Sequence, residues 1–243
     1  MTIKNHYQDD YAKINSIEHI PRLQKSIKLA HKYCKNKDSF ILDIGCGDGY
    51  ITSKFGDALS SGNLYGVDIS FNAKNDAFKN HNIKMIAHDL DTGRLSLNDG
   101  MFDFIFCGCL IELVQNPDHL LEEIQRLLKD DGIAIINNPN MNSWASRIAV
   151  FFGYLPYYGR VSTKYDLGKL GLGVSKGVST GFIRLFPTKV LRKLLILNNF
   201  KVIKTVGAAD NSMPAGFKFF DNFFSNFPSL AFQNIWVIKK NKI

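Results

Sequence analysis

The chain has 243 residues, 45% of them hydrophobic, and a formal net charge of +8 at pH 7. This length and composition support one sizeable core, which favours one domain carrying an insertion. The start of the chain lacks the apolar region of a signal peptide, and its longest apolar stretch, residues 148–158, is broken by Gly153 and Pro156 and is too short to cross a bilayer. These features argue against secretion and a membrane span, and predict a cytoplasmic location.

The region before the first strand contains a helical pattern. Ile20, Leu23, Ile27 and Ala30 recur every three or four residues, which places them on one face of a helix. We expect residues 1–38 to form an N-terminal helical cap that packs over the nucleotide-binding end of a sheet.

Residues 39–137 alternate short apolar runs with helical patterns, as βαβ units do. The runs are nearly all apolar, which is typical of parallel strands buried on both faces. Pro117 suits the start of a helix, Ser70 can cap another, and residues 130–132 suit a turn. The expected strands are 39–44, 63–68, 83–87, 101–107 and 133–137, and the expected helices are 50–59 and 117–129.

The alternation breaks between residues 138 and 186, which hold an aromatic cluster (151–158) followed by a glycine-rich run. A long segment with little pattern is usually functional, so we expect an insertion that acts as a lid over the substrate site. The alternation returns in residues 187–243, which complete the sheet. The expected elements there are a helix over 187–198 and strands over 201–206 and 232–239.

The segment that carries chemistry is residues 42–49, with the sequence LDIGCGDG. An apolar strand runs into three glycines at alternate positions, and glycines let the backbone turn sharply and approach a ligand closely. About twenty residues later a second strand ends in Asp68. A carboxylate at that place can accept hydrogen bonds from both hydroxyls of a ribose, so the pair of features indicates nucleoside binding.

Two details distinguish the cofactor. A dinucleotide fingerprint reads Gly-x-Gly-x-x-Gly, whereas this turn reads Gly-x-Gly-x-Gly and continues with Tyr50. Asp43 would repel a pyrophosphate, but it suits the ammonium and sulfonium groups of S-adenosylmethionine (SAM), which has no phosphate. The sequence therefore favours SAM over NAD(P) or FAD, which remains the alternative.

The ordered series of motifs resembles class I SAM-dependent methyltransferases. Residues 43–49 resemble their first motif, and residues 66–70 resemble their second. Asn138-Pro139-Asn140 and Trp144 are similar to the MetW-like subgroup of the type 11 methyltransferases. The further segments that resemble the family, in chain order, are 88–90, 102–107, 111–117, 127–132 and 181–186.

The resemblance implies an α/β fold: a Rossmann-like, seven-stranded, mostly parallel sheet with helices on both faces and a reversed last strand. It also implies that Asp68 binds the ribose, that Ile69 packs on adenine, and that Asp89 accepts the adenine amino hydrogen. For Leu90 and Cys107, packing in the core remains as an alternative to cofactor contact. The cofactor-binding residues that the resemblance implies are Asp43, Gly45, Cys46, Gly47, Gly49, Asp68, Ile69, Asp89, Leu90, Cys107 and Gly108.

The implied activity is in-line methyl transfer, in which the protein mainly supplies alignment and a dry site. A general base is needed only for an acceptor that is protonated at neutral pH, and no residue is assigned to that role. Two alternatives stay open: a non-catalytic SAM-binding partner subunit and an NAD(P)-dependent oxidoreductase. The candidate bases are His6, Tyr11, His19, His88 and Glu112.

The charge is concentrated in residues 138–243, which carry 15 Lys or Arg against three acidic residues. Together with the aromatic segments 151–158 and 217–228, this predicts a small or amphiphilic acceptor, anionic or lipid-linked, with peripheral membrane contact through this half. The alternatives are a solvated basic face that aids solubility and aromatic side chains that fill a small core between the lid and the sheet. The aromatics are not interleaved with Arg, which argues against nucleic acid. The four cysteines lack a metal-ligand spacing, so we expect no metal and buried thiols.

Overall fold

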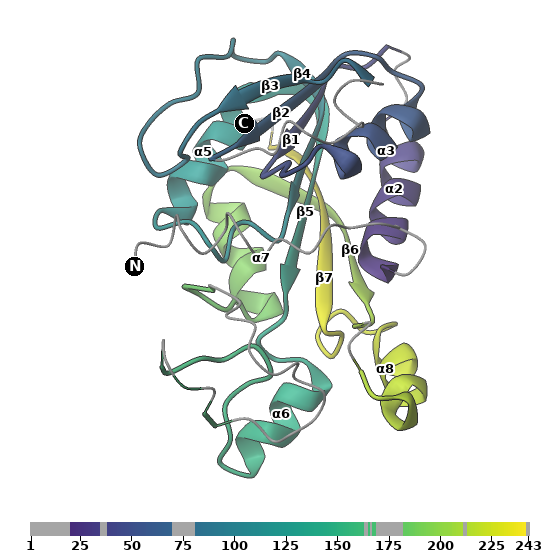
Figure 1. The fold of residues 1–243 in the computed structure, drawn as a ribbon, viewed down its shortest axis with the longest axis vertical. Coiled ribbons are helices and arrows are strands. Elements are labelled where there is room, and N and C mark those ends of the chain that lie inside the picture. The colour runs from purple at the N-terminus through teal and green to yellow at the C-terminus, as the bar shows by residue number, and fades with distance from the viewer. Residues whose placement is uncertain are drawn as a thin grey trace.

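The computed structural model describes residues 20–34, 38–69, 81–162, 165, 167–168, 182–210 and 213–241. Within them the chain forms one sheet flanked by helices (Figure 1). The strands are β1 (Ile41–Ile44), β2 (Leu64–Asp68), β3 (Lys84–Ala87), β4 (Phe102–Gly108), β5 (Leu128–Pro139), β6 (Phe200–Ala208) and β7 (Gln233–Lys240). The helices are α2 (Pro21–Tyr33), α3 (Tyr50–Leu59), α5 (Pro117–Leu127), α6 (Trp144–Phe151), α7 (Thr188–Leu197) and α8 (Lys218–Phe224), with a 3₁₀ turn at Ala215–Phe217.

The sheet has seven strands in the order β3-β2-β1-β4-β5-β7-β6. All neighbours from β3 to β5 are parallel, whereas β7 is antiparallel to both β5 and β6. The predicted α/β fold with a reversed last strand is therefore confirmed. Because β7 is reversed, its first residue lies at the same edge as the carboxyl ends of the other strands, and the candidate site forms along this edge.

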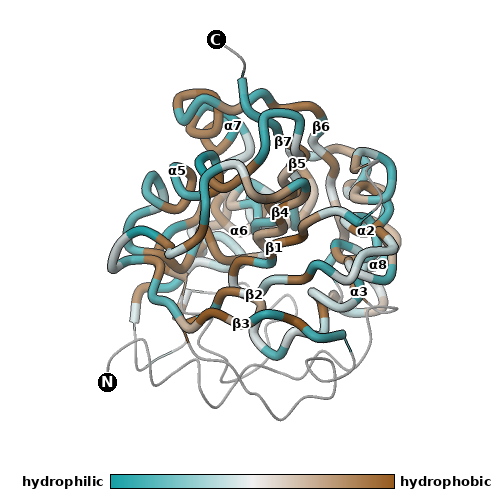
Figure 2. The backbone as a smooth tube through the Cα atoms, turned by 90° about the horizontal axis from the view of Figure 1, so that it is seen from above, coloured by the Kyte–Doolittle hydropathy of each residue, from teal (hydrophilic) through white to brown (hydrophobic). Residues whose placement is uncertain are grey.

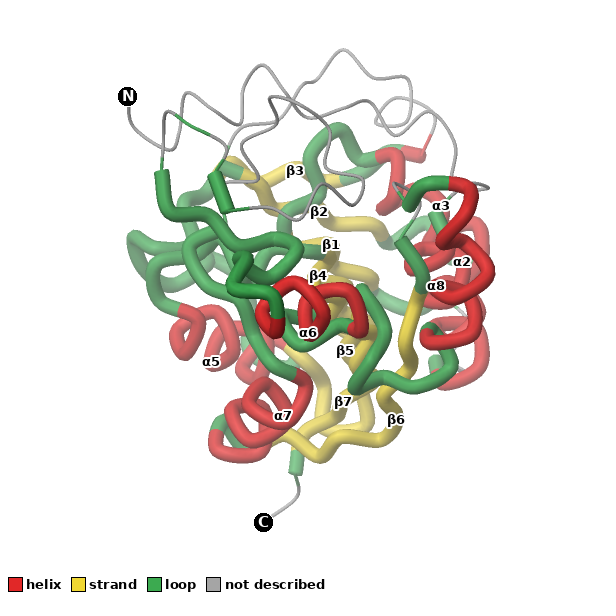
Figure 3. Tube along the Cα trace, turned by 90° about the horizontal axis from the view of Figure 1, so that it is seen from below, coloured by secondary structure: helices red, strands yellow, loops and turns green. Residues whose placement is uncertain are grey.

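Helices cover both faces of the sheet, as predicted. Figure 3 shows α5 and α7 on one side of the strands and α2 and α3 on the other. On the first side, Leu120 and Ile124 of α5 belong to the same buried cluster as Leu191 of α7. On the opposite side, a second cluster joins Leu23 of α2 and Phe55 of α3.

The helix predicted before the first strand is present as α2. Its apolar side packs beside α3 and shares a cluster with Ile235 and Val237 of β7. The Ser26 hydroxyl donates a hydrogen bond of 3.2 Å to the Asn137 side chain of β5. The helix thus covers the β5-β7-β6 part of one face, and the rest of the expected cap, residues 1–19, lies outside the described residues.

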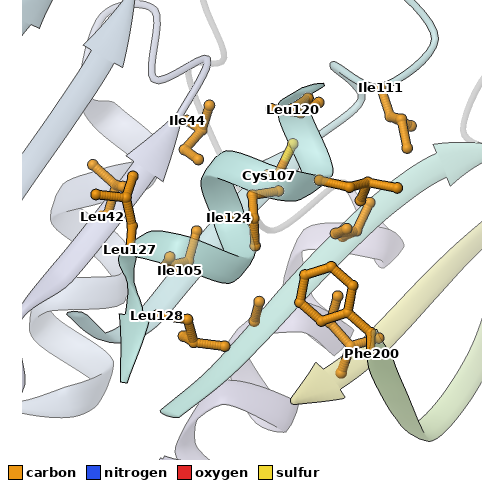
Figure 4. Packing of buried hydrophobic residues seen from close by; sticks show 14 of the residues in the cluster. Leu42, Ile44, Ile105, Cys107, Ile111, Leu120, Ile124, Leu127, Leu128 and Phe200 are labelled. Carbon is orange, nitrogen blue, oxygen red and sulfur yellow. The ribbon is translucent and has the colours of Figure 1, made fainter. Parts of the chain in front are cut away.

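The core consists of the central strands, whose side chains are buried on both faces. Figure 2 shows the hydrophobic segments gathered along β1 and β4. Figure 4 shows the α5 side of this core, where Leu120 and Ile124 lie near Ile105 and Cys107 of β4. Burial on both faces explains why these strands are almost uniformly apolar in sequence.

Some elements differ from the sequence prediction. The predicted turn at residues 130–132 lies within the bounds of β5, where the pairing with β4 jumps from Leu128 to Ile133. The helices α6 and α8 were not predicted, because apolar residues on their exposed sides hide the helical spacing. The expected cap at Ser70 lies outside the described residues.

The described residues also bear on membrane-spanning helices, on the cysteines and on metal-binding clusters. None of the helices described has the length and hydropathy required to cross a bilayer. All four cysteines are free thiols, and Cys34, Cys46 and Cys107 are buried. In the same ranges no group of three or more His, Cys, Asp or Glu side chains could hold a metal ion.

Candidate functional site

The glycine-rich turn joins β1 to α3 at the carboxyl edge of the sheet. Gly45, Gly47 and Gly49 all have positive φ, at 80°, 53° and 74°. L-residues with a side chain rarely adopt this conformation, so the sharp turn requires glycine. A Cβ on Gly47 would meet nothing within 4 Å, which leaves open space beside its backbone. The turn can therefore bring backbone N–H groups close to a ligand.

Asp43 lies beneath this turn and is almost fully buried, with 2% of its surface exposed. The Thr52 hydroxyl of α3 donates a hydrogen bond of 2.7 Å to its carboxylate. Burial raises the pKa of Asp43 to about 7, an effect that the Thr52 hydrogen bond opposes and the nearby Asp68 carboxylate reinforces. A cation bound at the turn would stabilise the ionised form.

Asp68 ends β2 beside the same turn. The Gly47 N–H donates a hydrogen bond of 2.9 Å to its carboxylate, which ties the two strand ends together. Ile69, the next residue, exposes 39% of its surface although it is apolar. A carboxylate next to an exposed apolar side chain matches what a ribose and a flat base require.

Asp89 and Leu90 follow β3, the next strand along this edge. The Asp89 side chain accepts a hydrogen bond of 3.1 Å from the Asp91 N–H and so caps its own turn. Leu90 is buried in the core on the α5 side. The structure thus places Asp89 at the same carboxyl edge of the sheet as the glycine-rich turn, while the Leu90 side chain packs inward.

Two cysteines, Cys46 and Cys107, are among the predicted cofactor-binding residues, and their side chains point into the protein. Cys46 packs against Gly66 of β2, where an added Cβ would come within 2.7 Å of its sulfur. Cys107 is fully buried in the apolar core, and burial raises its pKa well above the usual range. Gly108, directly after it, is partly exposed at the end of β4. Contact of the two cysteines with a ligand would therefore involve their backbone atoms.

The turn after β4 brings Glu112 to this edge. Leu110, in the same turn, would lie 3.3 Å from a Cβ on Gly45, so the turn packs directly against the glycine-rich loop. Glu112 is 1% exposed, and within the described residues neither carboxyl oxygen has a donor at hydrogen-bonding geometry. Burial raises the pKa of Glu112 to about 8, an effect that its own backbone, the Arg22 guanidinium and the Cys109 thiol oppose in part.

The other candidate bases are placed differently. The His88 ring lies 3.0 Å from the Gly93 carbonyl oxygen, which indicates a role in holding the turn after β3. His6, Tyr11 and His19 lie outside the described residues. Among the five candidates, Glu112 is thus the described group that is buried beside the glycine-rich turn.

A chain of polar contacts continues from the turn of Glu112 toward the insertion. The Cys109 thiol donates to the Gln233 side chain at 3.9 Å, and the Gln233 amide donates to the Tyr158 hydroxyl at 3.0 Å. Tyr158 in turn donates to the Asp210 carboxylate after β6. The contacts join the β4 turn, the insertion and the ends of β6 and β7 across one edge.

Replacing Tyr158 with Phe should destabilise the protein by about 1–3 kcal/mol, because Gln233 and Asp210 each lose a partly buried partner. The insertion should also be cleaved faster in limited proteolysis. Urea unfolding and a proteolysis time course would measure both effects. Tyr154→Phe is the matched control, since Tyr154 exposes 43% of its surface. Equal stability of the two variants would contradict this account of the contact chain.

Sequence reasoning missed several residues of this edge. Thr52 had a signal, because a hydroxyl three residues into the helix after a glycine-rich turn can reach back to the strand end. The others had none, because their partners are far away in sequence: Tyr158 and Gln233 are 75 residues apart. The residues without such a signal are Arg22, Tyr158, Asp210 and Gln233.

Comparison with known proteins shows similarity in sequence to methyltransferases. Residues 42–136 match the model of the methyltransferase domain family. Over 53% of its length the chain is 29% identical to a probable methyltransferase, ltbC, of Aspergillus luteorubrus, and 28% identical to a ubiquinone biosynthesis O-methyltransferase of Glaesserella parasuis. These matches cover 50% and 58% of the relatives, so the chain spans about half the length of the curated relatives it matches.

The fold is also similar to solved structures over nearly the whole chain. A 1,6-didemethyltoxoflavin-N1-methyltransferase of Burkholderia thailandensis, solved with S-adenosylhomocysteine bound, has a TM-score of 0.60 at 12% identity. The similarity covers 99% of this chain and 85% of that one. At this identity the similarity concerns the fold alone.

Proposed function

We propose that this chain is a class I SAM-dependent methyltransferase, in line with its match to the methyltransferase domain over residues 42–136, and that it transfers the SAM methyl group to a small or amphiphilic acceptor. The observation that carries the proposal is the pairing of the three positive-φ glycines with Asp43 and Asp68 at one edge. A nucleoside with a cationic amino-acid tail fits that arrangement, because each carboxylate lies where it would meet a donor or a cation.

The residues of the turn would hold the cofactor as follows. Asp68 would accept from the ribose hydroxyls and Ile69 would pack on adenine. Asp43, across the turn, would face the amino-acid part. SAM supplies an activated methyl group when bound, so the protein has to align the acceptor and exclude water.

Glu112 is our candidate for the group that receives the acceptor's proton. Because its pKa is raised to about 8, Glu112 would act in its ionised form, which predominates above that pH. An acceptor O–H or N–H would donate to that carboxylate, and the proton would pass to it as the methyl group arrives. The position supports this role, because Glu112 is a buried carboxyl in the turn that packs on the glycine-rich loop. The contact chain of Cys109, Gln233 and Tyr158 would close the acceptor side of the site.

Calorimetric titration tests cofactor choice directly. We expect SAM and S-adenosylhomocysteine to bind and NAD(P) not to bind. Incubation with SAM and fractionated metabolite or lipid extracts should then release S-adenosylhomocysteine. SAM binding without release from any extract would favour the alternative of a non-catalytic partner subunit, and binding of NAD(P) in place of SAM would overturn the proposal.

A further inference from the structure

The helices α6 and α8, with the residues next to them, carry an unusual number of exposed aromatic side chains. Figure 1 shows both helices at one end of the molecule, beyond the ends of β5 and β7. Phe151 exposes 83% of its surface and Phe219 exposes 76%. We call the following residues the aromatic end: Phe151, Phe152, Tyr154, Phe219, Phe220 and Phe223.

The helices α6 and α8 pack against each other beneath the aromatic end. Trp144 of α6 stacks on Phe224 of α8 with ring centroids 5.6 Å apart, and its indole N–H donates to Asp221 at 3.1 Å. Phe232 meets Trp144 edge-on and is fully buried. The small core therefore already uses its own aromatic residues, and those of the aromatic end are left outside it.

The exposed charged residues next to α6 and α8 in the described sequence are all basic. Residues 138–162 and 213–232 contain three basic residues, Arg147, Arg160 and Lys218, all exposed. The one acidic residue in these ranges, Asp221, is 1% exposed and accepts hydrogen bonds from Trp144 and from the Asp210 N–H. Its charge is therefore turned inward.

A hollow of about 270 Å³ opens at the base of α6. Two basic residues, Arg147 and Lys189, line it together with Thr188 and Ser229. A hollow with cations and hydroxyls near exposed aromatic rings has the chemistry to take an anionic headgroup while the rings enter the apolar boundary.

We infer that the aromatic end docks on an anionic lipid bilayer surface. Phenylalanine rings insert at the boundary between headgroups and acyl chains, and each nearby cation adds attraction to anionic lipids. Protein interfaces are also enriched in aromatic residues and Arg. The basic charge of one sign and the cation-lined hollow beside α6 are therefore the features that favour an anionic bilayer. The inference goes beyond methyl transfer, since docking needs neither cofactor nor turnover, and it would bring a lipid-linked acceptor to the carboxyl edge of the sheet.

Vesicle sedimentation tests the inference with the whole chain. Vesicles of phosphatidylcholine with phosphatidylglycerol should bind the protein at low salt about tenfold or more tightly than phosphatidylcholine alone, and added salt should weaken the binding. Phe151→Ser with Phe219→Ser should lower binding to anionic vesicles at least about tenfold, because both are highly exposed and lose apolar area at the boundary. Thermal unfolding should be unchanged.

Two controls make the result specific. Ile196→Ser with Leu197→Ser removes exposed apolar side chains from α7 and should leave vesicle binding unchanged. Lys189→Glu with Lys218→Glu should weaken binding to anionic vesicles but not to neutral ones. Absence of binding to anionic vesicles at low salt would overturn the inference. So would a dimer in light scattering that the two Phe→Ser changes dissociate without any vesicle binding.

Discussion

Replacing Asp68 with Ala should weaken SAM binding by about 1–3 kcal/mol, which is roughly 5- to 150-fold in affinity. The carboxylate would accept from the ribose hydroxyls, and it also accepts from the Gly47 N–H at 2.9 Å. Both donors lose their acceptor in the variant, and the turn loses its tie to β2. Calorimetric titration with SAM measures the change.

Two further variants separate these contributions. Asp68→Asn keeps an oxygen for the Gly47 N–H but loses the charge, so its affinity should lie between those of the wild type and Asp68→Ala. Asp131→Ala removes an exposed carboxylate of β5 and should bind SAM normally. Wild-type affinity of Asp68→Ala would refute the role assigned to Asp68.

Replacing Glu112 with Gln should flatten the pH dependence of stability. Burial raises the pKa of Glu112 from 4.5 to about 8, so the folded state keeps a proton that the unfolded chain releases. The stability that Glu112 contributes is therefore fully present below the unfolded pKa and falls as the pH rises toward 8. The fall attributable to Glu112 is on the order of 3 kcal/mol between about pH 5 and pH 7.5.

Urea unfolding at a series of pH values measures this effect. The wild type should lose stability across the interval, and Glu112→Gln should lose about 3 kcal/mol less. Asp43, whose pKa is raised to about 7, contributes a fall of the same sign in both proteins. Glu122→Gln is the matched control, because the Glu122 side chain is 70% exposed. Parallel curves for the wild type and Glu112→Gln would contradict the burial of an ionisable carboxyl.

The loss of stability that Glu112 causes as the pH rises toward 8 is of the kind expected at functional sites. A buried carboxyl lowers stability when it has to ionise, and such groups recur where chemistry requires a shifted pKa. A bound donor or cation would satisfy the carboxylate and recover part of that stability. Glu112 thus connects the stability of the chain to the occupancy of the proposed acceptor site.

The order and type of most elements could be predicted from the sequence. The helix expected over 50–59 is α3, and the strand expected over 63–68 differs from β2 by one residue. These elements were readable because their apolar periodicity reflects burial against a regular sheet. The helices α6 and α8 were missed, since apolar residues occur on their exposed sides as well as their buried ones.

The features that we propose hold the cofactor could also be predicted from the sequence. Glycines at alternate positions and an acidic residue at the next strand end are local features, and local backbone geometry requires them. Those of the acceptor half could not. Glu112 was one of five candidate bases, and nothing local in the sequence distinguished it from the others. Its burial near Arg22 and Cys109 is a result of tertiary packing.

The amino-acid sequence by itself determined the alternating fold, the sharp turn after β1 and the carboxylates beside it, because each depends on residues close together in the chain. Only the tertiary structure decided which polar groups are buried away from water and which aromatic rings stay exposed to it. Burial of Glu112, the contact of Tyr158 with Gln233 and the exposure of Phe151 all depend on segments distant in sequence. The solvation of a side chain depends on the packed molecule, so the proposed acceptor site and the aromatic end can be recognised only in the tertiary structure.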